Sequence, residues 1–272
     1  MNTIEHTPYI RNEKKWYFLS IFYAREKWGE LVAEILRFYQ ERKNQFDACL
    51  ISFSKEKGEQ IQVTFITSEK DNNNYSAEIQ FYFQRYIKYK PSMSQISFPY
   101  GQAIWCNYLN NSLEWDKNKL PDYSNQYISF HKKTIDLLYQ YLEDDFSPDA
   151  FLSVGMYMIL KGLFCLGEYE QRNTLQQILS IISVNLNENA KEKEKYNVFD
   201  IGKVCKTIES YRNENDNECS NELINWMNEF RNYLKIKDYS TLYFFICKIM
   251  GLTIIRQLVI LNIINKWYKC IC

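Results

Sequence analysis

The sequence predicts an α+β protein, with a sheet in its first half and helices in its second. In the early segment 60–65, apolar and polar residues alternate strictly, which is typical of a strand with one buried face. From residue 127 onward, apolar residues recur at helical spacing over nearly the whole remaining chain. The chain has 272 residues, of which 46% are hydrophobic and only 8 are Gly, so it can bury a sizeable core.

Six segments of the first half alternate between strand and helix patterns. In chain order they are a strand at 16–23, a helix around 32–39, strands at 46–53 and 61–67, a helix at 79–87 and a strand at 95–98. A polar turn at 55–59 separates the two middle strands, and Pro91 ends the second helix. The order β-α-β-β-α-β is that of the ferredoxin-like split βαβ unit. Many functions occur on this fold, so the fold alone does not predict an activity.

We expect the chain to be organised in four parts. They are a polar N-terminal segment at 1–14, the ferredoxin-like half at 15–110, a loop at 111–126 and a helical half at 127–272 that packs on the first. Residues 103–109 are expected to form a further strand or to continue the preceding strand past a turn, and the polar residues around Pro121 indicate the loop.

The last helix of the helical half is expected to run unbroken over 239–268. Lys248 and Arg256 interrupt its apolar pattern, so no run of about eighteen apolar residues remains. We therefore expect a helix of the protein core and no membrane span.

Composition limits the classes of ligand and compartment. The 33 basic and 33 acidic residues cancel, whereas a polyanion-binding protein normally has a basic excess, so we do not expect nucleic acid as the main partner. The eight cysteines form no C-x-x-C pair and only two histidines are present, which disfavours a zinc site. No G-x-G-x-x-G motif follows a strand and no P-loop is present, so we expect no cofactor. The polar N-terminus has no apolar signal-peptide core, which predicts a cytoplasmic protein with reduced thiols.

Three residues are candidates for charge or proton chemistry. His131, at the start of a helix, is suited to general acid or base catalysis, and the alternative is a surface histidine. Lys248 and Arg256 are cations eight residues apart in the most apolar helix, so they would share a face at roughly 12 Å and could bind a substrate anion. The alternative is that both lie on the exposed stripe of that helix.

Two aromatic residues are candidates for peptide binding. Tyr100 and Trp105 belong to the aromatic-rich region 81–108, which is suited to line a peptide groove. The alternative is that most of these rings belong to the core.

Three stretches carry a resemblance to a known family. The opening 15–18, the strand 58–65 and the late helix 242–251 are similar in order and local sequence to the thiopeptide-type bacteriocin biosynthesis domain. This domain also forms the C-terminal elimination part of class I lanthipeptide dehydratases. The chain resembles a divergent member of this family, and the resemblance covers loosely the whole chain.

This chain departs from the family at its functional positions. Gln62 and Thr64 stand where the family has arginines on its basic strand. Tyr243, Cys247 and Lys248 stand where the late helix of the family has a histidine and an Asn-Arg pair. Gly251 agrees with the family, and the Tyr/Gly-rich motif between the halves is reduced to Tyr100 and Gly101. No catalytic residue of the family can therefore be carried over.

The resemblance implies a maturation protein for a ribosomally made peptide (RiPP). As a lyase or cyclase, it would act on a modified precursor peptide by elimination or cyclisation at dehydrated Ser or Thr. Lys248 and Arg256 would then contact the developing anion, and His131 would transfer a proton. Two alternatives stay open. One is a non-catalytic subunit that binds the peptide at a sheet edge and partners a separate dehydratase-like enzyme. The other is an unrelated interaction protein.

Overall fold

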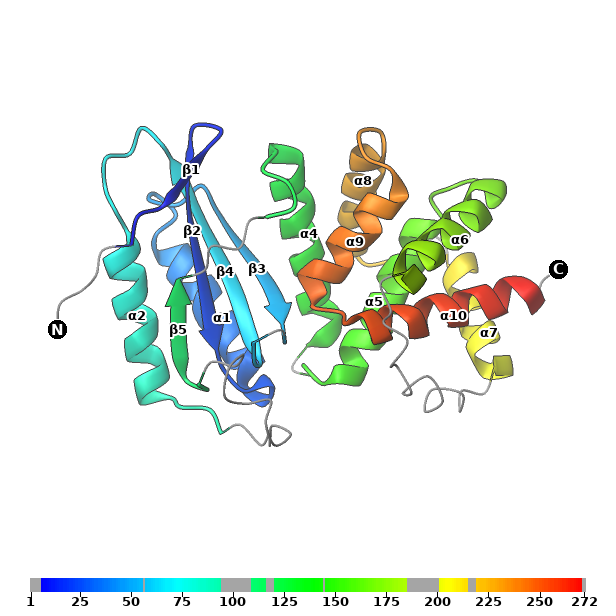
Figure 1. Ribbon diagram of the computed structural model, residues 1–272, viewed down its shortest axis with the longest axis horizontal. Coiled ribbons are helices and arrows are strands. Elements are labelled where there is room, and N and C mark those ends of the chain that lie inside the picture. Colours follow the sequence, from blue (N-terminus) through cyan, green and yellow to red (C-terminus); the bar gives the residue numbers. More distant parts are fainter. Residues whose placement is uncertain are drawn as a thin grey trace. The chain divides into compact units, whose positions relative to one another are not determined.

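The computed structural model describes residues 6–55, 57–93, 109–115, 120–143, 145–184, 201–214 and 219–270 (Figure 1). The chain divides into two compact units. Unit 1 comprises Met1–Ile135 with Leu142–Ser147, and unit 2 comprises Asp136–Tyr141 with Pro148–Cys272. Unit 1 contains the strands and unit 2 is helical, which confirms the predicted α+β class.

Unit 1 is built on one antiparallel sheet. Its strands are β1 (Tyr9–Arg11), β2 (Lys14–Phe22), β3 (Ala48–Ser54), β4 (Gln60–Ser68) and β5 (Ser112–Trp115). One edge of β2 pairs with β4, and β4 pairs in turn with β3. The other edge of β2 pairs with two short strands: β1 at the beginning of β2 and β5 at the end of β2. The 3-10 turn η1 (Arg25–Lys27) and α1 (Trp28–Glu41) connect β2 to β3, and α2 (Ser76–Tyr89) lies between β4 and β5. The spatial order β5-β2-β4-β3 with two intervening helices is the predicted ferredoxin-like arrangement.

The fourth strand of this arrangement lies where a loop was predicted. Ser112–Trp115 falls within the segment 111–126. The strand predicted at 95–98 lies outside the described residues, as does the strand predicted at 103–109 except for Leu109, which is not in a strand. Asn111 has a positive φ of 60° and donates its backbone N–H to the Phe22 carbonyl at 2.8 Å, so a tight turn leads directly into β5. Four residues are too few for alternation to stand out from the polar surroundings.

The polar N-terminal segment also contains a strand. β1 forms a hairpin with β2 through Asn12 and Glu13, whose φ angles of 53° and 57° are both positive. Two such residues are the requirement of a two-residue type I′ turn.

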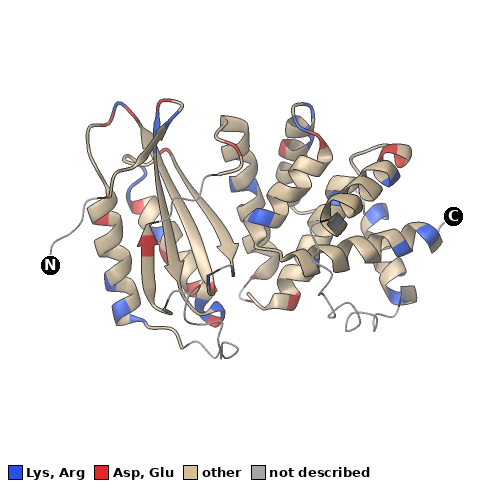
Figure 2. Cartoon of the chain, viewed as in Figure 1, with Lys and Arg blue, Asp and Glu red and all other residues tan. Residues whose placement is uncertain are grey.

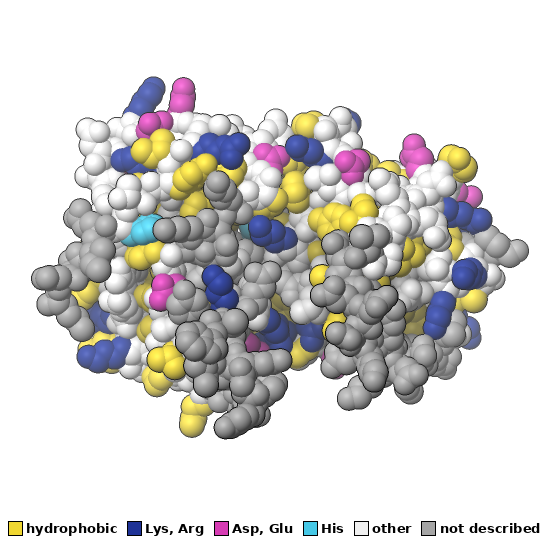
Figure 3. Space-filling model, viewed as in Figure 1, with side chains coloured by type: hydrophobic (Ala, Val, Ile, Leu, Met, Phe, Trp, Pro, Cys, Tyr) yellow, Lys and Arg dark blue, Asp and Glu magenta, His cyan; other side chains and the backbone are white. Residues whose placement is uncertain are grey.

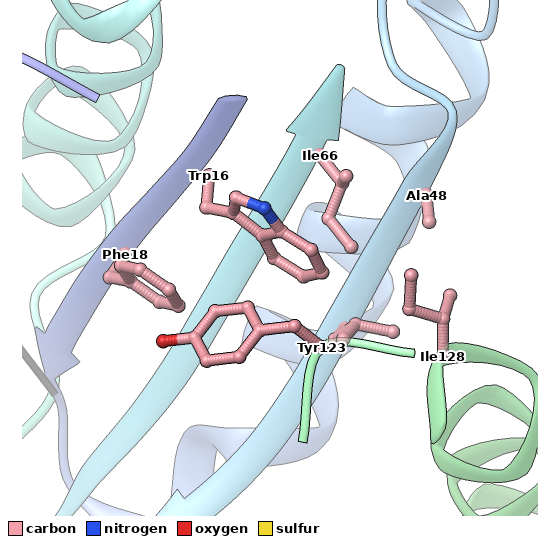
Figure 4. Packing of buried hydrophobic residues seen from close by; sticks show 7 residues of the cluster. Trp16, Phe18, Ala48, Ile66, Tyr123 and Ile128 are labelled. Atoms are coloured by element: carbon pink, nitrogen blue, oxygen red, sulfur yellow. The ribbon is translucent and has the colours of Figure 1, made fainter. Parts of the chain in front are cut away.

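Both faces of the sheet carry apolar residues. On one face, the rings of Phe38 from α1 and Phe83 from α2 pack on Phe65 of β4 at centroid distances of 5.2 and 6.3 Å. On the opposite face, Trp16 packs edge-on against Tyr123 at 5.0 Å (Figure 4). The rest of this second cluster comprises Phe18, Ala48, Leu50, Ile66 and Ile128.

Helices form the rest of the described chain. They are α4 (Asn125–Leu142), α5 (Pro148–Leu163), α6 (Glu168–Val184), α7 (Ile201–Asn213), α8 (Asn221–Leu234), α9 (Tyr239–Met250) and α10 (Ile254–Cys270). Helix α4 contributes to both units, and α5 packs against α7, α8, α9 and α10. This central position explains why α5 is apolar on most sides.

The long helix predicted at 239–268 is two helices. Gly251 adopts a left-handed conformation with φ 62° and ends α9. The N–H of Leu252 bonds to the Cys247 carbonyl at 2.9 Å and the N–H of Gly251 to the Lys248 carbonyl at 3.2 Å, which is a Schellman motif. No helix in the described part of the chain is long and apolar enough to cross a membrane.

Candidate functional site

The sheet face opposite α1 and α2 is divided into an apolar and a polar part. Side chains of directly paired residues point to the same face of a sheet. Trp16 is paired with Ile66, and Ile66 with Ala48, which builds the apolar part shown in Figure 4. Phe18 is paired with Thr64, so Thr64 points to this face as well.

Farther along the strands, four polar residues on four strands lie in register. Ser20 of β2 is paired with Gln62 of β4 on one side and with Glu114 of β5 on the other. Gln62 is in turn paired with Ser52 of β3. We call Glu114, Ser20, Gln62 and Ser52 the polar row. Neighbouring strands are about 4.8 Å apart, so the row spans about 14 Å across the sheet.

Burial differs along the polar row. Ser20 is buried, Gln62 and Ser52 are half-buried, and Glu114 is exposed. The hydroxyl and amide groups both donate and accept hydrogen bonds, and Glu114 supplies the only charge of the row. Such a set is suited to hydrogen-bond neutral groups such as peptide amides. It cannot by itself bind an anion by charge.

The alternation of β4 explains this geometry. Gln62 and Thr64 point away from α1 and α2, as the sequence predicts from the strict alternation of 60–65. They are the positions at which the resembled family has arginines, so β4 carries neutral groups at these two positions in this chain.

His131 is buried, so the alternative of a surface histidine is wrong. Its Nε2 lies 2.7 Å from the carbonyl oxygen of Ile51 on the edge strand β3, and its Nδ1 lies 3.2 Å from the Tyr127 hydroxyl. A carbonyl can only accept, so Nε2 carries a hydrogen. His131 thereby ties α4 to the edge strand beside Ser52, at one end of the polar row. Sequence patterns could not show this contact, because the partner is a main-chain atom eighty positions away.

Lys248 and Arg256 do not share a helix, so their predicted spacing of two turns is wrong. Lys248 is exposed in the last turn of α9, and Arg256 is half-buried in the first turns of α10, beyond Gly251. The exposed position of Lys248 agrees with the alternative of an exposed stripe. Tyr100 and Trp105 lie outside the described residues.

The buried face of α9 carries neutral groups. Tyr243 and Cys247 are one turn apart and both are buried. Burial raises the pKa of the Cys247 thiol to about 12, and burial likewise raises the pKa of Tyr243. Both side chains are therefore protonated near neutral pH, and neither supplies a nucleophile or a charge.

A buried ionic cluster in unit 2 was missed by the sequence reasoning. Lys161 of α5 is buried, and its Nζ lies 2.7 Å from a Glu214 carboxylate oxygen and donates to the Tyr211 carbonyl at 2.9 Å. The Tyr157 hydroxyl donates to the same carboxylate oxygen at 2.8 Å. Lys161 therefore binds the C-terminal end of α7, where a cation is favourable. A lysine within the apolar pattern of α5 was the signal that could have revealed it.

Among the residues that the structure describes, no group of three or more His, Cys, Asp or Glu side chains could hold a metal ion.

This chain is similar to known proteins in its structure but not in its sequence. No protein-family model matches the sequence, and no curated protein matches it significantly. Among solved structures, the chain is similar to "Pyridine synthase, TbtD, from thiomuracin biosynthesis". The TM-score is 0.66 at 10% identity, and the match covers 93% of this chain and 97% of that one.

It is also similar to TsrL, with a TM-score of 0.62 at 10% identity over 94% of this chain and 95% of that one. At this identity the likeness establishes the shared fold, from the sheet half through the helical half.

Proposed function

We propose that this protein acts in the maturation of a ribosomally made peptide, at a step of elimination or cyclisation at dehydrated Ser or Thr. The observation that carries the proposal is the likeness to a pyridine synthase over nearly the full length of both chains. A pyridine ring forms within a peptide when such a cyclisation is followed by eliminations that make the new ring aromatic. The proposed substrate is therefore a modified precursor peptide, and the proposed compartment is the cytoplasm.

In this proposal the polar row binds the main chain of the precursor. A dehydrated segment keeps its amide groups, and the half-buried side chains of Gln62 and Ser52 supply the amide and hydroxyl that match them, whereas Ser20 is buried. Elimination and cyclisation both place negative charge on a carbonyl oxygen in the transition state, which hydrogen-bond donors stabilise. Gln62 is half-buried at the centre of the row and is our first candidate donor.

The other candidates keep separate proposed roles. Lys248, exposed at the end of α9, and Arg256 are proposed to contact an anionic group of the peptide. Tyr100 and Trp105 are proposed to contact its side chains. His131 is proposed as a proton-transfer group, although both of its ring nitrogens contact protein atoms.

A binding experiment tests the polar row. A synthetic peptide carrying two dehydroalanines is titrated into the full chain and its affinity measured by calorimetry. Gln62→Leu keeps the size of the side chain but removes its amide, so we expect affinity to fall about tenfold, the equivalent of one hydrogen bond of about 1.4 kcal/mol. Gln177→Leu, at an exposed position of α6, is the matched control. Equal affinities of both variants would refute the role of the row.

The second candidate function is a non-catalytic subunit that presents the peptide to a dehydratase-like partner. The neutral groups at Gln62, Thr64, Tyr243 and Cys247 favour it, because the resembled family has basic or ionisable groups at these places. The two functions differ in what the isolated chain does. A subunit would bind the dehydrated peptide without converting it, and conversion would require the co-purified partner.

A further inference from the structure

Large apolar side chains are exposed at one place on unit 1. Phe81 and Tyr89 of α2 are 64% and 72% exposed, and Met93 and Leu109 beyond its end are 77% and 81% exposed. These are side chains that proteins usually bury at least in part. We call Phe81, Arg85, Lys88, Tyr89, Met93 and Leu109 the α2 surface.

Helix geometry places the first members on one face. Phe81, Arg85 and Tyr89 are four residues apart in succession, and the guanidinium of Arg85 lies 5.7 Å from the centroid of the Tyr89 ring. The opposite face of α2 is occupied by the core side chains Ile79 and Phe83. Phe81, Arg85 and Tyr89 are therefore not part of the core formed by the described residues of unit 1.

The last two members are held together at the end of α2. The side-chain amides of Asn110 and Asn111 both donate to the Ser92 carbonyl at 2.9 Å. Met93 and Leu109 directly adjoin these bonded residues in the chain. They extend the apolar surface past the C-terminal end of the helix.

The α2 surface is basic as well as apolar. Between residues 79 and 93 the chain has Arg85, Lys88 and Lys90 but no Asp or Glu. Glu34 of the neighbouring α1 is already bonded to Arg37 and to the Tyr82 hydroxyl. Figure 2 shows basic positions at one end of α2 and an acidic one at the other. In Figure 3 yellow and dark-blue side chains both reach the surface near that basic end.

We infer that the α2 surface binds an acidic peptide segment that also carries apolar side chains. Phe81 and Tyr89 supply anchors of the type that dominates binding energy, and Arg85 and Lys88 supply complementary charge. An anionic membrane is less suited, because stable lipid attraction takes clusters of about four to eight basic residues. Nucleic acid is less suited, because the chain has no basic excess. This inference concerns peptide capture away from the polar row, and it does not depend on the proposed chemistry.

The test is a selection from a phage-displayed library of random peptides on the full chain. The selected clones are then measured against Phe81→Ala/Tyr89→Ala and against Arg85→Glu/Lys88→Glu. These positions are exposed, so folding should not change, and circular dichroism verifies it. Tyr169→Ala and Lys206→Glu, at exposed positions of α6 and α7, are the matched controls.

We expect clones of net negative charge that contain apolar residues and that lose at least tenfold in affinity in either double variant but not in the controls. The inference is overturned if no clone depends on the α2 surface, or if the dependent clones are neutral or basic. It is also overturned if oligo-dT or phosphatidylserine vesicles bind in a variant-sensitive manner while acidic peptides do not.

Discussion

Replacement of Lys161 by Met should destabilise unit 2 by removing the cation that binds the end of α7. Lys161→Met keeps an unbranched side chain of similar length but loses the contacts of Nζ with Glu214 and Tyr211. Hydrogen bonds to charged groups contribute about 1.5–3 kcal/mol each, and breaking a buried ion pair costs about 3–5 kcal/mol. The Glu214 side chain is 25% exposed, so water solvates part of the unpaired carboxylate. We therefore expect a loss of about 2–3 kcal/mol in the free energy of unfolding.

The assay is urea unfolding followed by circular dichroism, with hydrogen exchange of the α7 amides to locate the effect. Lys206→Met, on the exposed side of α7, is the control and should change stability by less than about 0.5 kcal/mol. Adding Glu214→Gln to Lys161→Met should recover part of the loss, because no uncompensated carboxylate then remains. A loss in Lys161→Met no larger than that of the control would refute this reasoning.

Three further predictions concern unit 2. Gly162→Ala should lower the free energy of unfolding by about 1–2 kcal/mol, because the new Cβ would lie 2.9 Å from the buried ring of Phe230. This clash outweighs the better helix propensity of alanine. Thermal unfolding measures the change in stability. Asp238 caps the N-terminus of α9. Burial alone would raise the pKa of its carboxyl group, but the hydrogen bonds that it accepts, chiefly from the amide and hydroxyl of Thr241, have the larger combined effect, so the pKa lies below its ordinary value. The charge of Asp238 therefore adds stability above about pH 4, and the advantage of the wild type over Asp238→Asn in urea unfolding should vanish as the pH falls below that. Iodoacetamide at pH 8 should label the exposed Cys270 within minutes and leave Cys247 unlabelled in the folded protein, as mass spectrometry of digests will show.

Hydrophobic periodicity was sufficient to predict the main architecture. The long strands β2 and β4 and the amphipathic helices carry clear patterns, so the first five elements of the β-α-β-β-α-β order followed from the sequence. The elements that were missed depend on single residues. β5 is only four residues long, and one left-handed glycine, Gly251, ends a helix whose apolar pattern continues beyond it.

Less of the candidate site than of the fold could be predicted from the sequence. The orientation of Gln62 followed from alternation along one strand, but its alignment with Ser20 and Ser52 depends on strand register. The burial of His131 and the ion pair of Lys161 depend on partners at sequence separations of 80 and 53 residues, the second being 214 minus 161. Local patterns contain no information on such pairs.

The most direct test of the proposed function is tandem mass spectrometry of a dehydrated precursor peptide after incubation with the purified chain alone. The substrate is a precursor peptide rich in Ser, Thr and Cys in which Ser residues have been converted to dehydroalanine. We predict one of two products. Elimination gives a product whose mass is lower by that of the group lost, and cyclisation gives a product of unchanged mass whose fragmentation reveals a new ring between former dehydroalanines. Recovery of the peptide unchanged, with and without a co-purified partner enzyme, would contradict a role in peptide maturation.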